Sequence, residues 1–260
     1  MDDLTVTHFH EHGWMRVPGA FDQAAAEAMR TAVWRALAET GIERDRPSTW
    51  TVERPAHLKR LKSDPVFANA SSARLLKVIA DVADGTSGDP PANWGALFIA
   101  FPGAAPWHIP AKGWHADANY RGPVSPVRGV KIFALFGDVE PKGGGTLFLS
   151  GSHRLIHDWF RQNPPPADAR SADLRRLLLA HPYLRDLHGE GDPAERVARF
   201  MGRAEKWAGI PLRVIEQSGR AGDILLTHPL LLHVAAPNNG ARPRFLLSGG
   251  VTGDMWGWGT

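Results

Sequence analysis

The spacing of apolar side chains first predicts two helices near the start of the chain. In the segment 22–38 apolar residues recur at every fourth position, which is the period of one helix face, and Asp22 precedes them as a candidate N-cap. These residues are Ala25, Met29, Val33 and Leu37. A second helix is predicted over about 72–82, after a polar, proline-interrupted stretch at 41–65. Both helices are expected to flank the rest of the fold.

From residue 94 onward the pattern changes to that of strands. Short, largely apolar runs bounded by glycine or proline are typical of buried strands. Such runs lie at 96–101, 129–136, 146–149, 212–217, 223–227 and 244–251, after a first strand-like piece at 13–19. The series predicts a mainly β protein.

A stretch richer in charge and helix formers, about 155–210, interrupts the strands. Within it, 174–179 and 195–207 have the composition of helices, and Pro164, Pro165 and Pro166 break the pattern. Strands on both sides of one helical stretch indicate a single β-domain spanning 1–260 that carries a helical, lid-like insertion.

Composition narrows the chemistry open to such a domain. The 260 residues include 12 His and no Cys, so a metal site must use His, Asp and Glu. Lys+Arg number 30 against 27 Asp+Glu, a net charge of +3, without a basic, aromatic-interleaved stripe, which argues against a nucleic-acid partner. No apolar run approaches the ~20 residues that span a bilayer, and the acidic start lacks a secretion signal. A cytoplasmic protein with no membrane partner is therefore expected.

The most informative polar pattern lies at 113–120. His115 and Asp117 are two residues apart, so on an extended chain both side chains point to one face and can reach one metal ion. A third ligand must come from elsewhere, and His233, a lone imidazole in an apolar segment, is the candidate. Two His and one carboxylate form the facial triad of non-haem Fe(II) oxygenases. By itself H-x-D is a weak motif, and a solvated surface pair or a core histidine are the alternatives.

The last predicted strand adds a candidate cation. Arg244 shares a face with positions 246 and 248, so its guanidinium could project inward and clamp a dicarboxylate in bidentate fashion. Arg242 has the same parity and competes for this role.

Several motifs occur together in the order of a known family. They are Phe9, Gly13-Trp14 and Val17-Pro18-Gly19, then Trp114-His115-Ala116-Asp117, then the stretches 145–154 and 222–229, then His233 and Arg244. The stretch Gly151-Ser152-His153-Arg154 and the offset from His233 to Arg244 are the most specific. Over nearly its whole length the sequence resembles the phytanoyl-CoA dioxygenase-like group of Fe(II)/2-oxoglutarate oxygenases.

This resemblance implies a double-stranded β-helix (jelly-roll, cupin-like) core and a set of site residues. Fe(II) would be held by His115, Asp117 and His233, with 2-oxoglutarate chelating the iron and O2 as the second co-substrate. Arg244 would pair with the distal carboxylate of 2-oxoglutarate. The implied activity is hydroxylation, or a related oxidation, of an unactivated C–H of a small organic molecule, with release of succinate and CO2. A role in natural product biosynthesis is favoured. Related halogenases lack the carboxylate ligand, so Asp117 argues against halogenation.

Two further residues are candidates for co-substrate binding. The family often carries a hydroxyl two residues after the distal His, where this chain has Ala235; Thr146 is a candidate donor in its place, unless it merely pairs within its strand. Lys131 shares a face with Phe133 and Leu135, and inside the barrel it could meet the co-substrate or an anionic substrate group. The alternative is a lysine that extends outward to solvent.

Other interpretations remain open. His228 competes with His233, although its offset to Arg244 does not match the family. A cupin-like isomerase or hydrolase could use the same triad with Zn2+ or Mn2+ and no 2-oxoglutarate, but it would not need Arg244. A jelly-roll binding module that has lost catalysis is disfavoured by the intact polar set. A small-molecule substrate is expected, and the absence of a sequence signal for an obligate interface is compatible with a monomer.

Overall fold

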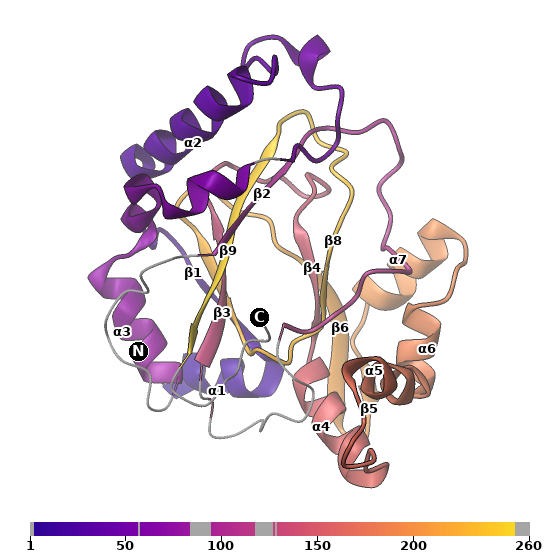
Figure 1. Cartoon of the computed structure of the whole chain (residues 1–260). Helices are drawn as coiled ribbons and strands as arrows, with labels where there is room; N and C mark the ends of the chain where they lie inside the picture. The colour runs from indigo at the N-terminus through magenta and orange to yellow at the C-terminus, as the bar shows by residue number, and fades with distance from the viewer. Residues whose placement is uncertain (1–2, 57, 84–94, 118–126, 128, 253–260) are drawn as a thin grey trace.

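Two antiparallel sheets facing each other dominate the computed structural model, which describes residues 3–56, 58–83, 95–117, 127 and 129–252 (Figure 1). The larger sheet has the order β1 (Trp14–Val17), β7 (Ile224–Thr227), β3 (Gly129–Leu135), β9 (Arg244–Thr252) and β2 (Ala96–Ala100). The smaller has the order β5 (Glu205–Trp207), β6 (Ile210–Glu216), β4 (Thr146–Ser150) and β8 (His233–Ala235). The mainly β, double-stranded β-helix architecture predicted from the sequence is confirmed.

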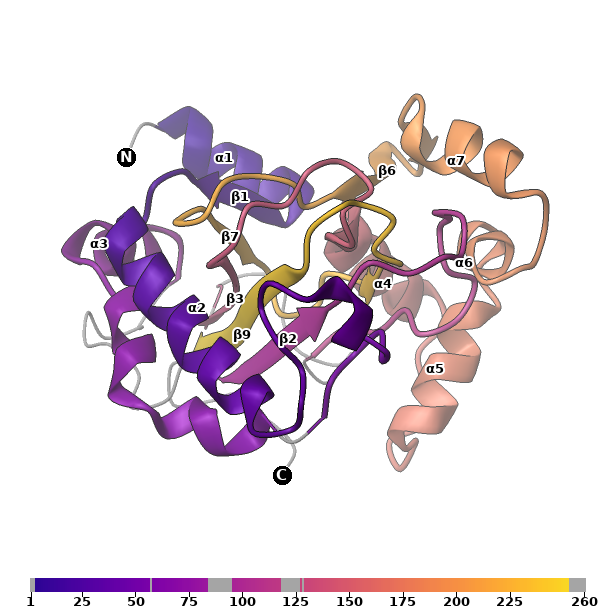
Figure 2. The ribbon, with the colours of Figure 1, turned by 90° about the horizontal axis from the view of Figure 1, so that it is seen from above.

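The N-terminal helices cover the outer face of the larger sheet (Figure 2). They are α1 (Asp3–His12), α2 (Gln23–Ala38), η1 (Pro47–Thr49), η2 (Leu58–Ser63), η3 (Pro65–Ala70) and α3 (Ala73–Val82). The Asp22 carboxylate accepts a hydrogen bond from the Ala25 backbone N–H at 2.7 Å, which caps α2 as predicted. Ser72 caps α3 in the same way, through Leu75 N–H at 3.1 Å. None of the helices that the structure describes is long and apolar enough to cross a membrane.

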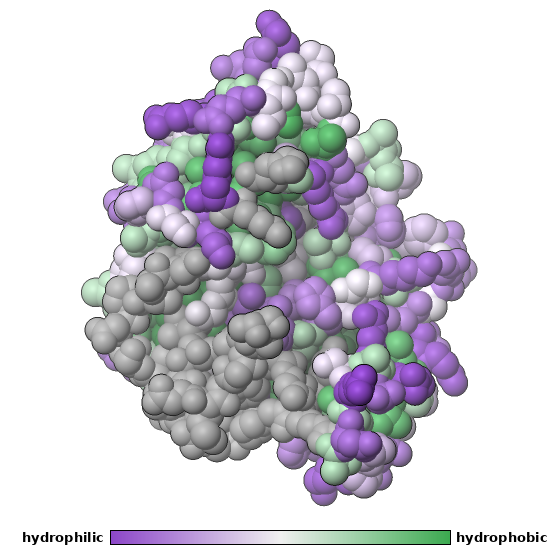
Figure 3. All heavy atoms as spheres, in the orientation of Figure 1, coloured by the Kyte–Doolittle hydropathy of each residue, from purple (hydrophilic) through white to green (hydrophobic). Residues whose placement is uncertain are grey.

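The helical insertion packs against the outer face of the smaller sheet. It comprises α4 (Ser152–Gln162), α5 (Ser171–Leu179), α6 (Pro182–Leu187) and α7 (Pro193–Met201). Apolar side chains such as Leu155 and Phe200 meet Leu147 and Leu149 of β4, while hydrophilic side chains cover much of the opposite, solvent side (Figure 3).

One predicted helix boundary is wrong. The helix expected over 195–207 ends at Met201, and residues 205–207 form β5, which pairs with β6. Ala208 and Gly209 connect these strands, and both have positive φ, 46° and 80°. A two-residue connection with two positive φ angles favours a tight hairpin, which is incompatible with a continuing helix.

Alternation along the strands separates the inner and outer faces. On β3, Val130 and Ile132 join the core beneath the N-terminal helices, whereas Phe133 and Leu135 pack between the sheets. Lys131 lies on the same inner face as Phe133. The space between the sheets therefore receives both apolar and charged side chains, and it is there that the site lies.

Candidate metal centre

Backbone pairing brings two distant histidines together. His115 and His233 form an antiparallel bridge, with His115 N–H donating to His233 O at 3.1 Å and His233 N–H donating to His115 O at 2.9 Å. Trp114, buried with its indole N–H bonded to Pro110 O at 2.8 Å, anchors one side of this bridge. Because side chains alternate, the burial of Trp114 in the outer core directs His115 toward the inside. The two imidazole ring centroids are 4.3 Å apart.

Asp117 completes the group. Its Oδ1 lies 3.9 Å from His115 Nε2, and its Oδ2 lies 3.5 Å from His233 Nε2. One potential ligand atom from each of the three residues lies within 4.8 Å of the others. Among the described residues, His115, Asp117 and His233 are the three His, Asp or Glu side chains whose ligand atoms come this close together. The H-x-D…H facial triad is therefore present in the fold.

The tautomers of both histidines fit a metal ion. His115 Nδ1 is 2.8 Å from Gly113 O and His233 Nδ1 is 3.1 Å from Leu231 O, so each Nδ1 carries the proton and donates it to a carbonyl. Each Nε2 then keeps a lone pair. Burial lowers the pKa of His233 to about 4, despite the opposing effect of Asp117, so this imidazole is neutral at pH 7. Two imidazoles oriented by backbone carbonyls and one carboxylate match the donor set of non-haem Fe(II).

The triad opens into a cavity of about 650 Å³ between the sheets. Arg244, at the start of β9, also lines this cavity and is only 3% exposed. Its Nη1 donates to Gly144 O at 2.6 Å, whereas its buried Nε has no hydrogen-bond partner. Burial, and to a smaller extent the nearby Arg54, lowers the pKa of Arg244 to about 10, so it stays cationic at neutral pH. A buried guanidinium with an orphaned donor fits a carboxylate such as that of 2-oxoglutarate.

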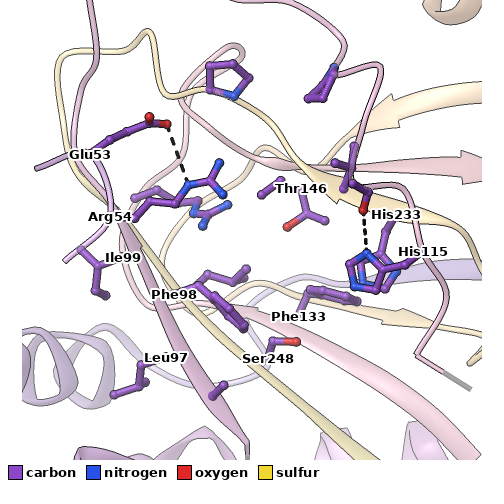
Figure 4. Close-up of a pocket in the computed structure, with 18 of the residues that line it drawn as sticks. Glu53, Arg54, Leu97, Phe98, Ile99, His115, Phe133, Thr146, His233 and Ser248 are labelled. Atoms are coloured by element: carbon purple, nitrogen blue, oxygen red, sulfur yellow. Dashed lines mark hydrogen bonds and ion pairs between the residues drawn. The ribbon is translucent and has the colours of Figure 1, made fainter. Parts of the chain in front are cut away.

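The other predicted residues divide into two groups. Thr146 and Lys131 line the cavity, and Figure 4 shows Thr146 between Arg54 and the two histidines. Lys131 is an inward lysine, so the outward alternative is wrong: its Nζ lies 3.2 Å from Asp117 Oδ2. Arg242 lies outside the cavity, with its exposed side chain 3.9 Å from Asp138. His228 is buried elsewhere, against the ring of His153.

Some cavity residues are missed by sequence reasoning. Glu53 and Arg54 line the cavity from the polar, proline-interrupted stretch at 41–65. The sequence of this stretch has no periodicity that would indicate which residues face inward. Phe98 of β2 lines the cavity and is 48% exposed, although an apolar strand residue is expected to be buried. Ser248, which also lines the cavity, could have been predicted from the sequence, because it lies on the same face of β9 as Arg244.

The described residues of the insertion lie outside the lining of the cavity. The described residues that line the cavity come from 53–55, 96–99, 108–117, β3, β4, 233–237 and β9, and none comes from 155–210. The reason is packing, because the apolar faces of α4–α7 are buried on the outer face of the smaller sheet.

Solved structures share this architecture at low sequence identity. The epimerase SnoN, solved in complex with Fe3+, alpha ketoglutarate and nogalamycin RO, is 16% identical and has a TM-score of 0.54, with 99% of this chain and 86% of that chain covered. HygX from Streptomyces hygroscopicus, solved with nickel and 2-oxoglutarate bound, is 16% identical with a TM-score of 0.54, covering 98% and 88%. AviO1 from Streptomyces viridochromogenes Tue57 is 15% identical with a TM-score of 0.52, covering 97% and 95%.

At this identity the structural matches show the fold alone. No curated protein matches the sequence. A family model described as phytanoyl-CoA dioxygenase (PhyH) matches residues 9–246, a span that includes the triad and Arg244. The chain belongs to the phytanoyl-CoA dioxygenase family of Fe(II)- and 2-oxoglutarate-dependent oxygenases.

Proposed function

We propose that this protein is a dioxygenase that hydroxylates an unactivated C–H of a small organic molecule. Fe(II) is held by His115, Asp117 and His233, and 2-oxoglutarate is held through its distal carboxylate by Arg244. The observation that carries the proposal is that three converging ligand atoms and a buried guanidinium with an orphaned donor share one cavity. The described residues would form one catalytic unit, because both sheets contribute to that cavity.

When bound, the iron, 2-oxoglutarate and O2 supply an oxidative decarboxylation that releases succinate and CO2 and provides the oxidising power for C–H hydroxylation. The protein provides position and exclusion of water. Arg244 fixes the far end of the co-substrate, and Thr146, a buried residue that lines the same cavity, offers a hydroxyl to it. Phe133 and Leu246 line the same cavity with apolar surface, which limits water beside the reacting groups.

The substrate is proposed to be a small molecule of the natural-product type. The cavity lies in the size range of small-ligand pockets and has an apolar wall that includes Leu97 and Phe98. SnoN, which shares the fold, was solved with a natural product bound, and this supports the same class of ligand here. Because the segments 53–55 and 108–113 line the cavity, we place substrate selection on them and not on the helical insertion.

The direct test is 2-oxoglutarate turnover by the protein reconstituted anaerobically with Fe(II) and then exposed to O2. The wild-type protein is expected to release succinate and CO2 slowly without substrate and faster with an accepted one. Asp117→Ala is expected to abolish this turnover and weaken Fe(II) binding. A wild-type protein that does not consume 2-oxoglutarate contradicts the proposal, and metal-dependent turnover of a substrate without it supports a cupin-like isomerase or hydrolase.

Arg244→Leu tests the proposed binding of the distal carboxylate of 2-oxoglutarate separately from metal binding. Loss of one member of a buried charge pair costs about 2–5 kcal/mol, so the Kd for 2-oxoglutarate should rise at least about 30-fold by calorimetry on the metal-loaded protein. The matched control is Arg242→Leu, which removes an exposed guanidinium two residues away and should leave the Kd unchanged. Equal effects of the two variants would contradict the role of Arg244.

A further inference from the structure

Lys131 makes a contact that the proposed chemistry does not itself require. Its side chain is 15% exposed, and its Nζ lies 3.2 Å from Asp117 Oδ2 and 5.9 Å from the ring centroid of Phe133. The backbone of Lys131 is in the middle of the larger sheet, paired with Thr227 on one side and Gly250 on the other. The ammonium therefore projects from a rigid strand onto a carboxylate of the triad.

Such a placement has an electrostatic cost. A lysine that leaves water must recover its solvation from its partners, and one partner of Lys131 is a carboxylate of the proposed metal site. A cation beside a metal site repels the metal, so Lys131 weakens metal binding by Coulomb's law unless it improves the geometry. A lysine at this position therefore indicates a role in arranging Asp117.

The backbone of Lys131 lies far along the larger sheet from that of Arg244, the residue proposed to bind 2-oxoglutarate. Along β9, Arg244 is paired with Ala100, whereas Gly250, the partner of Lys131, lies six residues further on. At roughly 3.3 Å per residue the two backbone positions are about 20 Å apart along the strand. The backbone of Lys131 is therefore well separated along the sheet from that of Arg244, although both side chains line the same cavity.

A carboxylate can bind a metal through one or both of its oxygens. With both, Asp117 would occupy a coordination position that a facial triad leaves open for small ligands. The two oxygens already differ in their surroundings: Oδ2 faces Lys131 and His233 Nε2, and Oδ1 faces His115 Nε2. An ammonium 3.2 Å from Oδ2, in an ion pair without a hydrogen bond, attracts that oxygen and disfavours rotation of the carboxylate toward a chelating position.

We propose that Lys131 is a positioning residue that makes Asp117 a one-oxygen ligand. By pairing with the carboxylate it holds a single orientation, so one coordination position stays open for the co-substrates. This inference rests on the proposed function, because it needs a metal ion on His115, Asp117 and His233. It differs from direct binding of the co-substrate by Lys131, because the contact that the structure shows is with Asp117.

The test uses Mn(II) alone as a paramagnetic probe of the full-length protein without 2-oxoglutarate. The number of water molecules on bound Mn(II) is measured by the broadening of its magnetic resonance spectrum in 17O-labelled water. Lys131→Met removes the charge and keeps the length, and it is expected to lose one bound water while binding Mn(II) at least as tightly. Lys131→Arg keeps the charge and should retain the wild-type water number.

The matched control is Lys77→Met, which removes an exposed lysine that lies 3.1 Å from Asp81. It should leave the water number and the Mn(II) affinity unchanged. If Lys131→Met does not fold, Lys131→Gln serves as the uncharged variant. An unchanged water number in the uncharged variant overturns the inference and leaves the proposed function intact. Failure of the wild-type protein to bind Mn(II) overturns the proposed function and this inference with it.

Discussion

Two pairs of packed histidines make an instructive comparison. The rings of His115 and His233 are 4.3 Å apart, and those of His153 and His228 are 4.9 Å apart. In the first pair a carboxylate lies 3.5 Å from His233 Nε2, and both imidazoles face a cavity. In the second pair the His153 ring nitrogen Nε2 donates to His10 O at 3.0 Å, and Leu230 N–H donates to His228 Nδ1 at 3.0 Å.

The difference lies in what surrounds the rings. Backbone groups bond both pairs, but in the first pair they bond Nδ1 and leave Nε2 directed at a carboxylate. In the His153–His228 pair, a backbone carbonyl engages His153 Nε2 and the surroundings are packed: a Cβ added to Gly13 would lie 2.5 Å from His153 Nδ1. Proximity of imidazoles is thus no sign of a metal site. A carboxylate and an accessible cavity distinguish the first pair.

The largest expected effect comes from making the same His→Gln substitution in one member of each pair and comparing the affinities for Mn(II). His233→Gln removes a proposed ligand, so its Kd for Mn(II) should rise at least about 100-fold, because loss of groups that merely orient ligands already costs 10–100-fold. His228→Gln should leave the Kd unchanged and lower the melting temperature, because it alters a buried side chain away from the cavity. Calorimetric titration and thermal unfolding measure both quantities. A loss of metal affinity in His228→Gln would contradict the assignment of metal binding to the His115–His233 pair alone.

The pH dependence of stability tests the burial of His153 in the second histidine pair. Burial lowers the pKa of His153 to about 4 from 6.5, so between these values the unfolded chain binds a proton that the folded protein does not. The contribution of the neutral, buried His153 to the free energy of unfolding is therefore complete above pH 6.5. It falls by about 3 kcal/mol in total as the pH is lowered toward 4.

Urea unfolding at a series of pH values measures this slope. In His153→Gln the slope between pH 6.5 and 4 should become shallower, whatever the absolute stability of the variant. The control is His10→Gln, which removes an exposed imidazole and leaves the backbone carbonyl that His153 bonds. A slope that is unchanged in His153→Gln would show that its burial does not govern the acid response.

Two glycine substitutions test how tightly the His153–His228 pair is packed. Gly13 and Gly19 both have positive φ, 78° and 56°, but a Cβ at Gly13 would meet His153 and Leu231, whereas at Gly19 it would meet nothing within 4 Å. Gly19→Ala should cost about 1 kcal/mol from backbone strain alone, and Gly13→Ala about 1–3 kcal/mol more from overpacking. Thermal unfolding of the two variants measures the difference. Equal losses would indicate that the surroundings of His153 relax easily.

Features that depend on neighbouring residues can be predicted from local residue patterns. The cap at Asp22, the strand runs and the inward parity of Arg244 all follow from local spacing, and the structure has each of them. The H-x-D motif likewise places two ligands by the alternation of one segment. These features need no knowledge of the rest of the chain.

Contacts between distant side chains depend on the tertiary structure and cannot be predicted from local patterns. The bridge between His115 and His233 depends on pairing between segments more than 100 residues apart, and the sequence does not specify that register. The same holds for the contact of Lys131 with Asp117 and for the entry of Arg54 into the cavity. The insertion lies on the outer face of the smaller sheet because burial of its apolar faces there outweighs its position in the sequence. Local periodicity fixes the face on which a residue lies, and the packing of sheets and helices determines what that face meets.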